Sequence, residues 1–306
     1  MMIIKEETTV EKLSRKMAYK PNEEILEKMR TTFYSCPTAV NYCRNLGVPD
    51  ELIDKHIDIL YDFARDINYC KKCPGIDNCI KENPLLCTKI VYEDGFLDRQ
   101  LSPCRRLLEK MRLKNQFLVM DFDEDWINKG SNEFNKSAGR KKAMEKYAEF
   151  AKKGDSTWIY LTGEQNTGRS YVAAYMAIDI AKKEKGPVAF INTASRFRQL
   201  SDMNYKKQEL FQKTLDLYCT VPVLVLDDFG NELKNDFVRD AILFEILSKR
   251  SANHLFTIFT SDFVVEDIET LYGTTKAAAL RAKQIAKILK GNIGEGEINL
   301  GDISIY

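Results

Sequence analysis

The sequence predicts an α/β protein whose second half holds a mostly parallel sheet, joined to a helical and cysteine-rich first part. From Thr157 onward, short apolar runs alternate with helical stretches. Such alternation is typical of parallel strands connected by crossover helices. A glycine-containing loop follows the first run, and five of the eight cysteines gather between residues 69 and 104. The four apolar runs are 158–161, 188–191, 223–226 and 257–260.

Length and composition limit the function classes. A chain of 306 residues is long enough for two domains. Its hydrophobic fraction of 44% and charged fraction of 30% are typical of a soluble globular protein. No apolar run is long enough to span a membrane, and the N-terminus becomes charged too early for a signal peptide. We therefore expect a cytoplasmic protein with no membrane partner. The net charge of +1 means that nucleic-acid binding needs a local basic patch.

Residues 1–118 are expected to form the first domain, with helices up to about residue 65. One apolar-periodic stretch runs from Glu23 to Met29, and helix resumes from Leu107 to Leu113. Between 69 and 104, prolines and a glycine are expected to break any regular element. A further helix face is formed by apolar residues at three- and four-residue steps: Leu52, Ile53, Ile57, Leu60 and Phe63.

A linker is expected at residues 119–142, because the segment 121–142 is polar, charged and poor in apolar residues. The second domain would then cover residues 143–306. Its first element is expected to be a lead-in helix over 142–152.

The clustered cysteines indicate a metal site. Disulfides are disfavoured in a cytosolic protein, so such a cluster points to metal binding. Thiolates two residues apart suit one side of a tetrahedral zinc site, and sulfur ligands without histidine fit a closed structural site. By spacing alone, Cys79 and Cys87 are equally valid as third ligand. The cluster contains Cys70, Cys73, Cys79, Cys87 and Cys104, whereas Cys36, Cys43 and Cys219 are interpreted as buried or partly buried thiols.

A candidate phosphate-binding loop follows the first apolar run. It has the G-x-x-x-x-G-K-[ST] spacing between a strand and a helix, with arginine in place of lysine. Its backbone N–H groups and the helix N-terminus would face an anion, and Ser170 is placed to bind Mg²⁺. Arg169 keeps the positive charge, but its planar fork does not replace a compact ammonium, so hydrolysis is put in doubt. The loop residues are Gly163, Glu164, Gln165, Asn166, Thr167, Gly168, Arg169 and Ser170.

Four further candidate residues lie later in the chain. The apolar run 223–226 ends in two carboxylates: Asp227 would hold the Mg²⁺ shell, and Asp228 would orient or polarise the attacking water. Asp262 is a further catalytic candidate at the polar end of the run 257–260, although an acid beside a triphosphate is unfavourable unless a cation intervenes. In the last predicted helix, Arg281 is a candidate for completing a neighbouring subunit's site, and a basic solvated helix face is the alternative.

This arrangement resembles the bacterial replicative helicase loaders of the DnaI primosomal type, which contain a small AAA+ module. The resemblance covers nearly the whole chain. It rests on the stretch 227–232 (Asp-Asp-Phe-Gly-Asn-Glu), the strand 158–161 before the phosphate loop, and Thr260-Ser261. The family's zinc-ligand spacing favours Cys87 over Cys79 as the third ligand, which gives the set Cys70, Cys73, Cys87 and Cys104.

The resemblance implies an AAA+ P-loop domain that binds ATP and Mg²⁺, and a helical N-terminal zinc-binding domain. It also implies the partners: the hexameric replicative helicase, single-stranded DNA and a self-oligomer. The segment 192–213 lies where relatives contact DNA, and its candidate contacts are Arg196, Phe197, Arg198, Tyr205, Lys206 and Lys207. A solvated helix pair is the alternative for that segment. For the whole chain, the alternatives are a degenerate ATPase acting as an adaptor and a transposition-helper ATPase.

Overall fold

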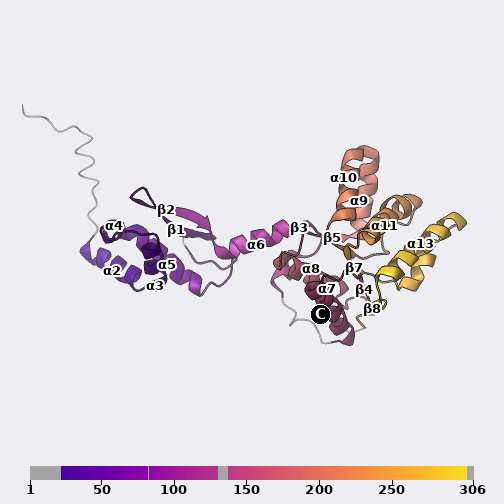
Figure 1. The fold of residues 1–306 in the computed structure, drawn as a ribbon, viewed down its shortest axis with the longest axis horizontal. Coiled ribbons are helices and arrows are strands. Elements are labelled where there is room, and N and C mark those ends of the chain that lie inside the picture. The colour runs from indigo at the N-terminus through magenta and orange to yellow at the C-terminus, as the bar shows by residue number, and fades with distance from the viewer. Residues whose placement is uncertain (1–21, 82, 130–136, 302–306) are drawn as a thin grey trace, which may run out of the picture. The chain divides into compact units, whose positions relative to one another are not determined.

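A computed structural model describes residues 22–81, 83–129 and 137–301, and the helices expected before residue 22 lie outside these ranges. The chain divides into two compact units, Met1–Met111 and Arg112–Tyr306 (Figure 1). Each unit has its own hydrophobic core. Among the described residues, no helix combines the length and apolar character needed to cross a bilayer.

Helices form the core of the first unit. Asn22 accepts a hydrogen bond from the Glu24 backbone N–H and so caps the first helix. Another helix begins at Pro37, whose fixed φ suits a first turn. The predicted helix face at 52–63 is confirmed, although a break at His56 divides it between two helices. The helices are α2 (Glu23–Tyr34), α3 (Pro37–Asn45), α4 (Asp50–Lys55) and α5 (Ile57–Lys71), and α6 (Arg105–Gln116) follows the hairpin below.

A β-hairpin corrects the prediction that residues 69–104 contain no regular element. Strand β1 (Leu86–Glu93) pairs antiparallel with β2 (Phe96–Pro103). The two residues between them, Asp94 and Gly95, both have positive φ, at 52° and 82°. An Asp-Gly pair in this conformation is the preferred two-residue hairpin turn, so the sequence did carry the signal. The hairpin packs on the helices through buried Ile90 and Leu97.

The second unit is built on a six-stranded parallel sheet with the order β3-β5-β6-β7-β4-β8. All four predicted strands are confirmed, and the parallel arrangement is as expected. Two further strands lie at the sheet edges. The bounds are β3 (Phe117–Met120), β4 (Ile159–Thr162), β5 (Val188–Asn192), β6 (Val223–Asp227), β7 (Phe256–Thr260) and β8 (Ile298–Asn299).

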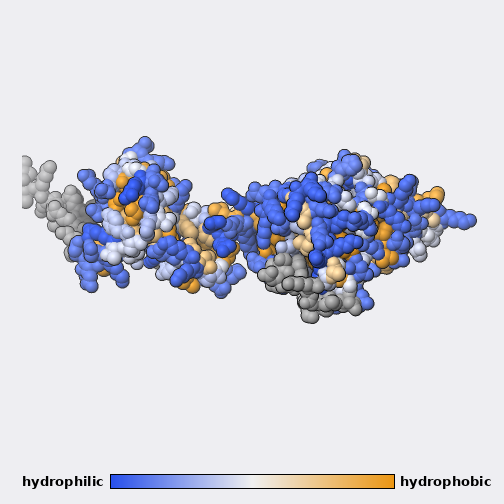
Figure 2. Space-filling model, turned by 60° about the horizontal axis from the view of Figure 1, so that its bottom comes forward, coloured by the Kyte–Doolittle hydropathy of each residue, from blue (hydrophilic) through white to orange (hydrophobic). Residues whose placement is uncertain are grey.

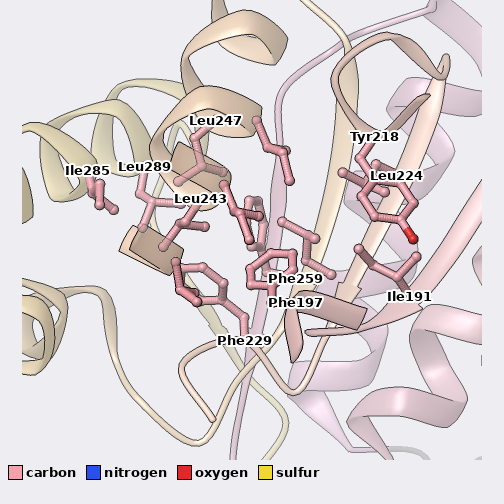
Figure 3. Packing of buried hydrophobic residues seen from close by; sticks show 14 of the residues in the cluster. Ile191, Phe197, Tyr218, Leu224, Phe229, Leu243, Leu247, Phe259, Ile285 and Leu289 are labelled. Carbon is pink, nitrogen blue, oxygen red and sulfur yellow. The ribbon is translucent and has the colours of Figure 1, made fainter. Parts of the chain in front are cut away.

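Helices cover both faces of this sheet, and neighbouring strand residues belong to different clusters. Ile159 packs with α7 and α8, whereas Tyr160 packs with the helices of the opposite face. Figure 3 shows the latter cluster, in which Phe197, Phe229 and Phe259 lie close together. The elements are η1 (Glu124–Asn128), α7 (Ala138–Lys153), α8 (Arg169–Lys182), α9 (Thr193–Lys206), α10 (Gln208–Thr220), η3 (Val238–Leu243), α11 (Phe244–Ala252), η4 (Val265–Asp267), α12 (Ile268–Tyr272) and α13 (Lys276–Asn292).

The segment expected to be a linker contains regular structure in its described part. Strand β3 pairs with β5, and the short helix η1 follows it. Helix α7 begins at Ala138, within the expected linker, and includes the predicted lead-in helix. The residues surrounding this sheet are hydrophilic over most of the face that Figure 2 shows. Apolar side chains are buried between the sheet and its helices, as expected of an α/β fold.

A buried arginine connects two helices to the start of an inner strand of the sheet. Arg250 on α11 is fully buried. Its guanidinium donates to the carbonyls of Tyr218, Val221 and Phe256 at 3.1, 2.7 and 2.6 Å. Its Nε also donates to the Thr257 hydroxyl at 2.9 Å. These bonds join α10, α11 and β7 without any carboxylate partner among them.

Replacing Arg250 with methionine should lower the free energy of unfolding by about 3–5 kcal/mol, because buried carbonyl groups would lose their donors. Urea denaturation would measure the loss. Lys249→Met is the matched control, since the Lys249 side chain is 41% exposed and should change stability by less than about 1 kcal/mol. Equal effects of the two changes would contradict this interpretation.

Candidate nucleotide-binding site

The predicted phosphate loop joins β4 to α8 in a conformation suited to an anion. Gly163, Asn166 and Gly168 have positive φ values of 141°, 63° and 79°. At Gly163, a Cβ would lie 3.1 Å from the Gly301 carbonyl oxygen, so a side chain would be both strained and crowded. Gly168 occupies the N-cap of α8. The helix N-terminus therefore opens directly onto the loop, as a phosphate site requires.

Helix α7 supports the loop from below. The Arg140 guanidinium donates to the Thr167 carbonyl at 2.8 Å, and Arg140 is only 2% exposed. The Thr167 hydroxyl in turn donates to the Glu164 carbonyl at 2.7 Å. The glycine at position 139 allows α7 to pack closely against β8, because a Cβ there would lie 2.0 Å from the Asn299 carbonyl oxygen. Sequence reasoning missed Arg140, because no spacing links it to the loop.

The structure brings Ser170 and Asp227 together. Asp227 ends β6 and is 6% exposed. Its carboxylate accepts a hydrogen bond from the Thr260 hydroxyl at 2.6 Å and another from Ser170. Burial raises the pKa of Asp227, and these two hydrogen bonds oppose the rise. A hydroxyl beside a carboxylate offers the oxygen ligands that Mg²⁺ prefers.

Asp228 is held by neighbouring strands. It has a positive φ of 54°, which is uncommon for aspartate and marks a constrained backbone. Its backbone N–H donates to the Thr260 hydroxyl at 3.0 Å. Its carboxylate accepts from the Asn192 side-chain amide at 2.8 Å. Sequence reasoning did not assign this role to Asn192, although a polar residue at the end of the apolar run 188–191 was the available signal.

The structure pairs Arg169 with Asp262, two residues that the sequence analysis treated separately. The Arg169 guanidinium forms an ion pair with the Asp262 carboxylate. It also donates to the carbonyls of Gly163 and Ser261 at 2.8 and 2.5 Å. The cation that an acid at this position requires is therefore supplied by the loop arginine itself.

A second ion pair fixes the start of α9. Asp121 directly follows β3, and its carboxylate pairs with the Arg196 guanidinium, with the Nε–Oδ2 distance at 2.6 Å. The same carboxylate accepts from the Asn192 backbone N–H at 3.1 Å. Asp121 therefore holds the first turn of α9 next to the residue that contacts Asp228. Phe197, on the same turn, is buried in the core.

Arg281 lies on α13 with partners in its own chain. It stacks over the Phe244 ring at 3.8 Å, pairs with Asp240 at 3.3 Å and donates to Gln284 at 2.8 Å. None of these three partners belongs to the predicted phosphate site. Its side chain is 34% exposed, and its role toward a neighbouring subunit stays a prediction.

The structure does not support the predicted zinc site. Within residues 22–81, 83–129 and 137–301, no three His, Cys, Asp or Glu side chains gather as metal ligands. Cys70 and Cys87 have their sulfur atoms 3.8 Å apart. The Lys81 ammonium lies 3.1 Å from the Cys87 sulfur and also pairs with Asp66. This places positive charge where the proposed site would need to accommodate a dication.

The other two predicted ligands are Cys104 and Cys73. Cys104 accepts a hydrogen bond from the Leu107 backbone N–H at 3.3 Å. Cys73 is partly buried. Among the described residues, the structure therefore gives no support to a zinc site formed by Cys70, Cys73, Cys87 and Cys104. The interpretation of Cys36, Cys43 and Cys219 as buried thiols is confirmed.

Comparisons with known proteins agree with this geometry. A family described as IstB-like ATP binding protein matches residues 93–285, which is more than half of the chain. The chain belongs to this family. It is also similar to the replicative helicase loader DnaI of Bacillus subtilis (strain 168). That relative is 24% identical over 230 residues, with 72% of this chain and 73% of the relative covered.

A solved structure shows the same fold. The crystal structure of DnaI matches with a TM-score of 0.53 and 24% identity, covering 62% of this chain and 99% of that chain. The resemblance to DnaI-type proteins that the motifs predicted is therefore confirmed. ATP is the nucleotide named in the family's description, so the family identifies this member as an ATP-binding protein.

Replacing Thr260 with valine should weaken binding of Mg²⁺–ATP by about tenfold, because the hydroxyl holds both Asp227 and Asp228. Isothermal titration calorimetry would measure this. Thr214→Val is the matched control, since the Thr214 hydroxyl bonds only to a carbonyl of its own helix. Unchanged affinity in the Thr260 variant, with the fold intact, would show that the two acids do not need this hydroxyl.

Proposed function

We propose that this protein is a primosomal helicase loader. In this role it binds ATP and single-stranded DNA, and it helps place the hexameric replicative helicase on DNA during initiation of replication. The observation that carries the proposal is the pairing of Ser170 with Asp227 beside a phosphate loop, in a chain similar to a protein named as a replicative helicase loader.

The extent of the similarity favours a loader over a transposition-helper ATPase. The match to the Bacillus subtilis relative covers 72% of the chain. That share is longer than the unit Arg112–Tyr306, so the similarity must reach into residues before Arg112. The relative matched over this length is named as a replicative helicase loader, which supports the loader over the transposition helper.

The proposed nucleotide site has a role for each of its residues. The loop 163–168 and the start of α8 would surround the phosphates with backbone N–H groups. Ser170 and Asp227 would hold Mg²⁺, which neutralises phosphate charge when bound. Asp228 would orient the attacking water, with Asn192 fixing its carboxylate. Arg281 would act on the site of a neighbouring subunit in a self-oligomer.

Slow hydrolysis is part of the proposal. Asp262 forms an ion pair with the guanidinium of Arg169, the loop cation that would otherwise face phosphate. This observation also favours the second candidate, an adaptor that binds nucleotide but hardly hydrolyses it. Phosphate release measured with and without single-stranded DNA separates the two candidates, because only a loader that uses hydrolysis should respond to DNA.

The proposed DNA contact lies at the junction of α9 and α10, which lie side by side (Figure 1). Tyr205 is 83% exposed, and Lys206 and Lys207 beside it are exposed as well. Exposed aromatic and basic side chains together suit sequence-tolerant binding of single strands. Arg198 is exposed on the same helix. Arg196 and Phe197 are excluded from this contact, because one is paired with Asp121 and the other is buried.

Mixing the protein with the replicative helicase of its host should give a complex with up to about six copies per helicase hexamer. Native mass spectrometry with and without ATP would detect it. Asp227→Asn should keep the complex but remove any effect of ATP, whereas the exposed control Asp202→Asn should behave like the parent. If no complex forms under either condition, the loader proposal fails.

Tyr205→Ala should weaken binding of a labelled oligo-dT strand by about fivefold or more, because a stacking platform is lost. Lys207→Ala should reduce the salt dependence of binding, since one phosphate contact is removed. Fluorescence anisotropy at several salt concentrations would measure both. Tyr34→Ala, which removes an exposed tyrosine on α2, is the control. Identical affinities in all four proteins would exclude this surface.

A further inference from the structure

The guanidinium of Arg169 makes three contacts within the protein. Its guanidinium donates to Gly163 at the start of the phosphate loop and to Ser261 just beyond β7. Its remaining side is paired with the Asp262 carboxylate. The Arg169 side chain is only 11% exposed, so solvent screens this pair less than a surface ion pair. The positive charge of Arg169 is therefore already paired with a carboxylate of the protein.

Asp262 is held on its second oxygen as well. The Asn231 side-chain amide donates to that oxygen at 2.8 Å, from the turn that follows β6. Burial acts to raise the pKa of Asp262, but the hydrogen bonds from Asn231 and Arg169 outweigh it and lower the pKa below its usual value. Asp262 is thus an anion at neutral pH, fixed by two donors in front of the loop arginine.

The charges around the phosphate loop affect how it would receive an anionic ligand. Three carboxylates, those of Asp227, Asp228 and Asp262, lie at the ends of β6 and β7. Asp227 and Asp228 have no arginine or lysine among their hydrogen-bond partners within the described residues. An approaching phosphate therefore meets an arginine whose charge is already balanced.

We propose that Asp262 is a specificity-determining residue of the nucleotide site, whose carboxylate competes with the terminal phosphate of ATP for Arg169. The inference rests on the proposed nucleotide-binding function. Backbone N–H groups of such a loop cradle the inner phosphates, whereas the loop cation reaches the outer ones. ADP can use the backbone cradle while the ion pair persists. The third phosphate of ATP must either displace Asp262 or lie beside it.

The consequence is a site that favours ADP over ATP more strongly than the loop alone would. Displacement of Asp262 by the third phosphate would break the contact between Arg169 and Asp262 and free Asn231 from its partner. The turn after β6 would thereby respond to the third phosphate. This response passes through residues that contact one another directly, so it needs no distant conformational change.

Competition binding tests the inference. A fluorescent ADP derivative would be displaced by unlabelled ADP and by ATP, both with Mg²⁺, from the full-length protein. In Asp262→Asn, the ratio of the ATP to the ADP dissociation constant should fall by about tenfold or more, because the competing charge is gone. The exposed residue on α9 provides the control Asp202→Asn, which removes the same charge elsewhere and should leave the ratio unchanged.

Two further variants separate competition from a purely structural role. Arg169→Met and the double change Arg169→Met with Asp262→Asn complete a double-mutant cycle. Asp262→Asn should change the ATP to ADP ratio only when Arg169 is present, because methionine removes the cation for which the carboxylate and the phosphate compete. A cycle in which only the thermal midpoint changes, while the ratio stays within about twofold, would overturn the inference. Failure of every variant, including the parent, to bind any nucleotide would instead overturn the proposed function and the inference with it.

Discussion

The parallel register of β4, β6 and β7 determines where the chemistry of this molecule lies. Leu226 pairs with Phe259, so Asp227 and Thr260 follow on neighbouring strands at the same level. Leu161 pairs with Thr260, which brings the phosphate loop to that level as well. One hydroxyl, that of Thr260, can then bond to the carboxylate of Asp227 and to the backbone of Asp228. A shift of one residue in either strand would turn these side chains to the other face of the sheet.

Charge is the second constraint on the site. Asp227 and Asp228 can remain next to each other because hydroxyl and amide donors satisfy them, and because a divalent cation would bind between the acids and a phosphate. Asp262 is satisfied differently, by a guanidinium from the loop. A lysine at position 169 could not donate to Gly163, Ser261 and Asp262 in the same planar arrangement. The arginine and the acid are therefore best understood as one feature.

Much of this could be predicted from the sequence, because the relevant signals are local. Short apolar runs predict the strands, and the glycine spacing predicts the phosphate loop. Asp227 is the last residue of its strand, directly after an apolar run. The pairing of Arg169 with Asp262 could not be predicted, since it depends on the strand order that places β7 beside β4. Arg140 could not be predicted either, because no sequence spacing links α7 to the phosphate loop. The zinc prediction failed for a different reason. Cysteine spacing indicates which ligands are available, but it does not show whether their side chains come together in the fold.

Helix α9 shows why a residue pattern alone does not define a binding surface. Basic and aromatic residues alternate along it, and the sequence suggests one continuous DNA contact. In the fold, the first turn faces inward, where Arg196 bonds to Asp121 and Phe197 enters the core. Only the far end of the helix presents Tyr205 and its neighbouring lysines to solvent. The helix thus has one end held beside Asn192 and Asp228 and the other end exposed to solvent.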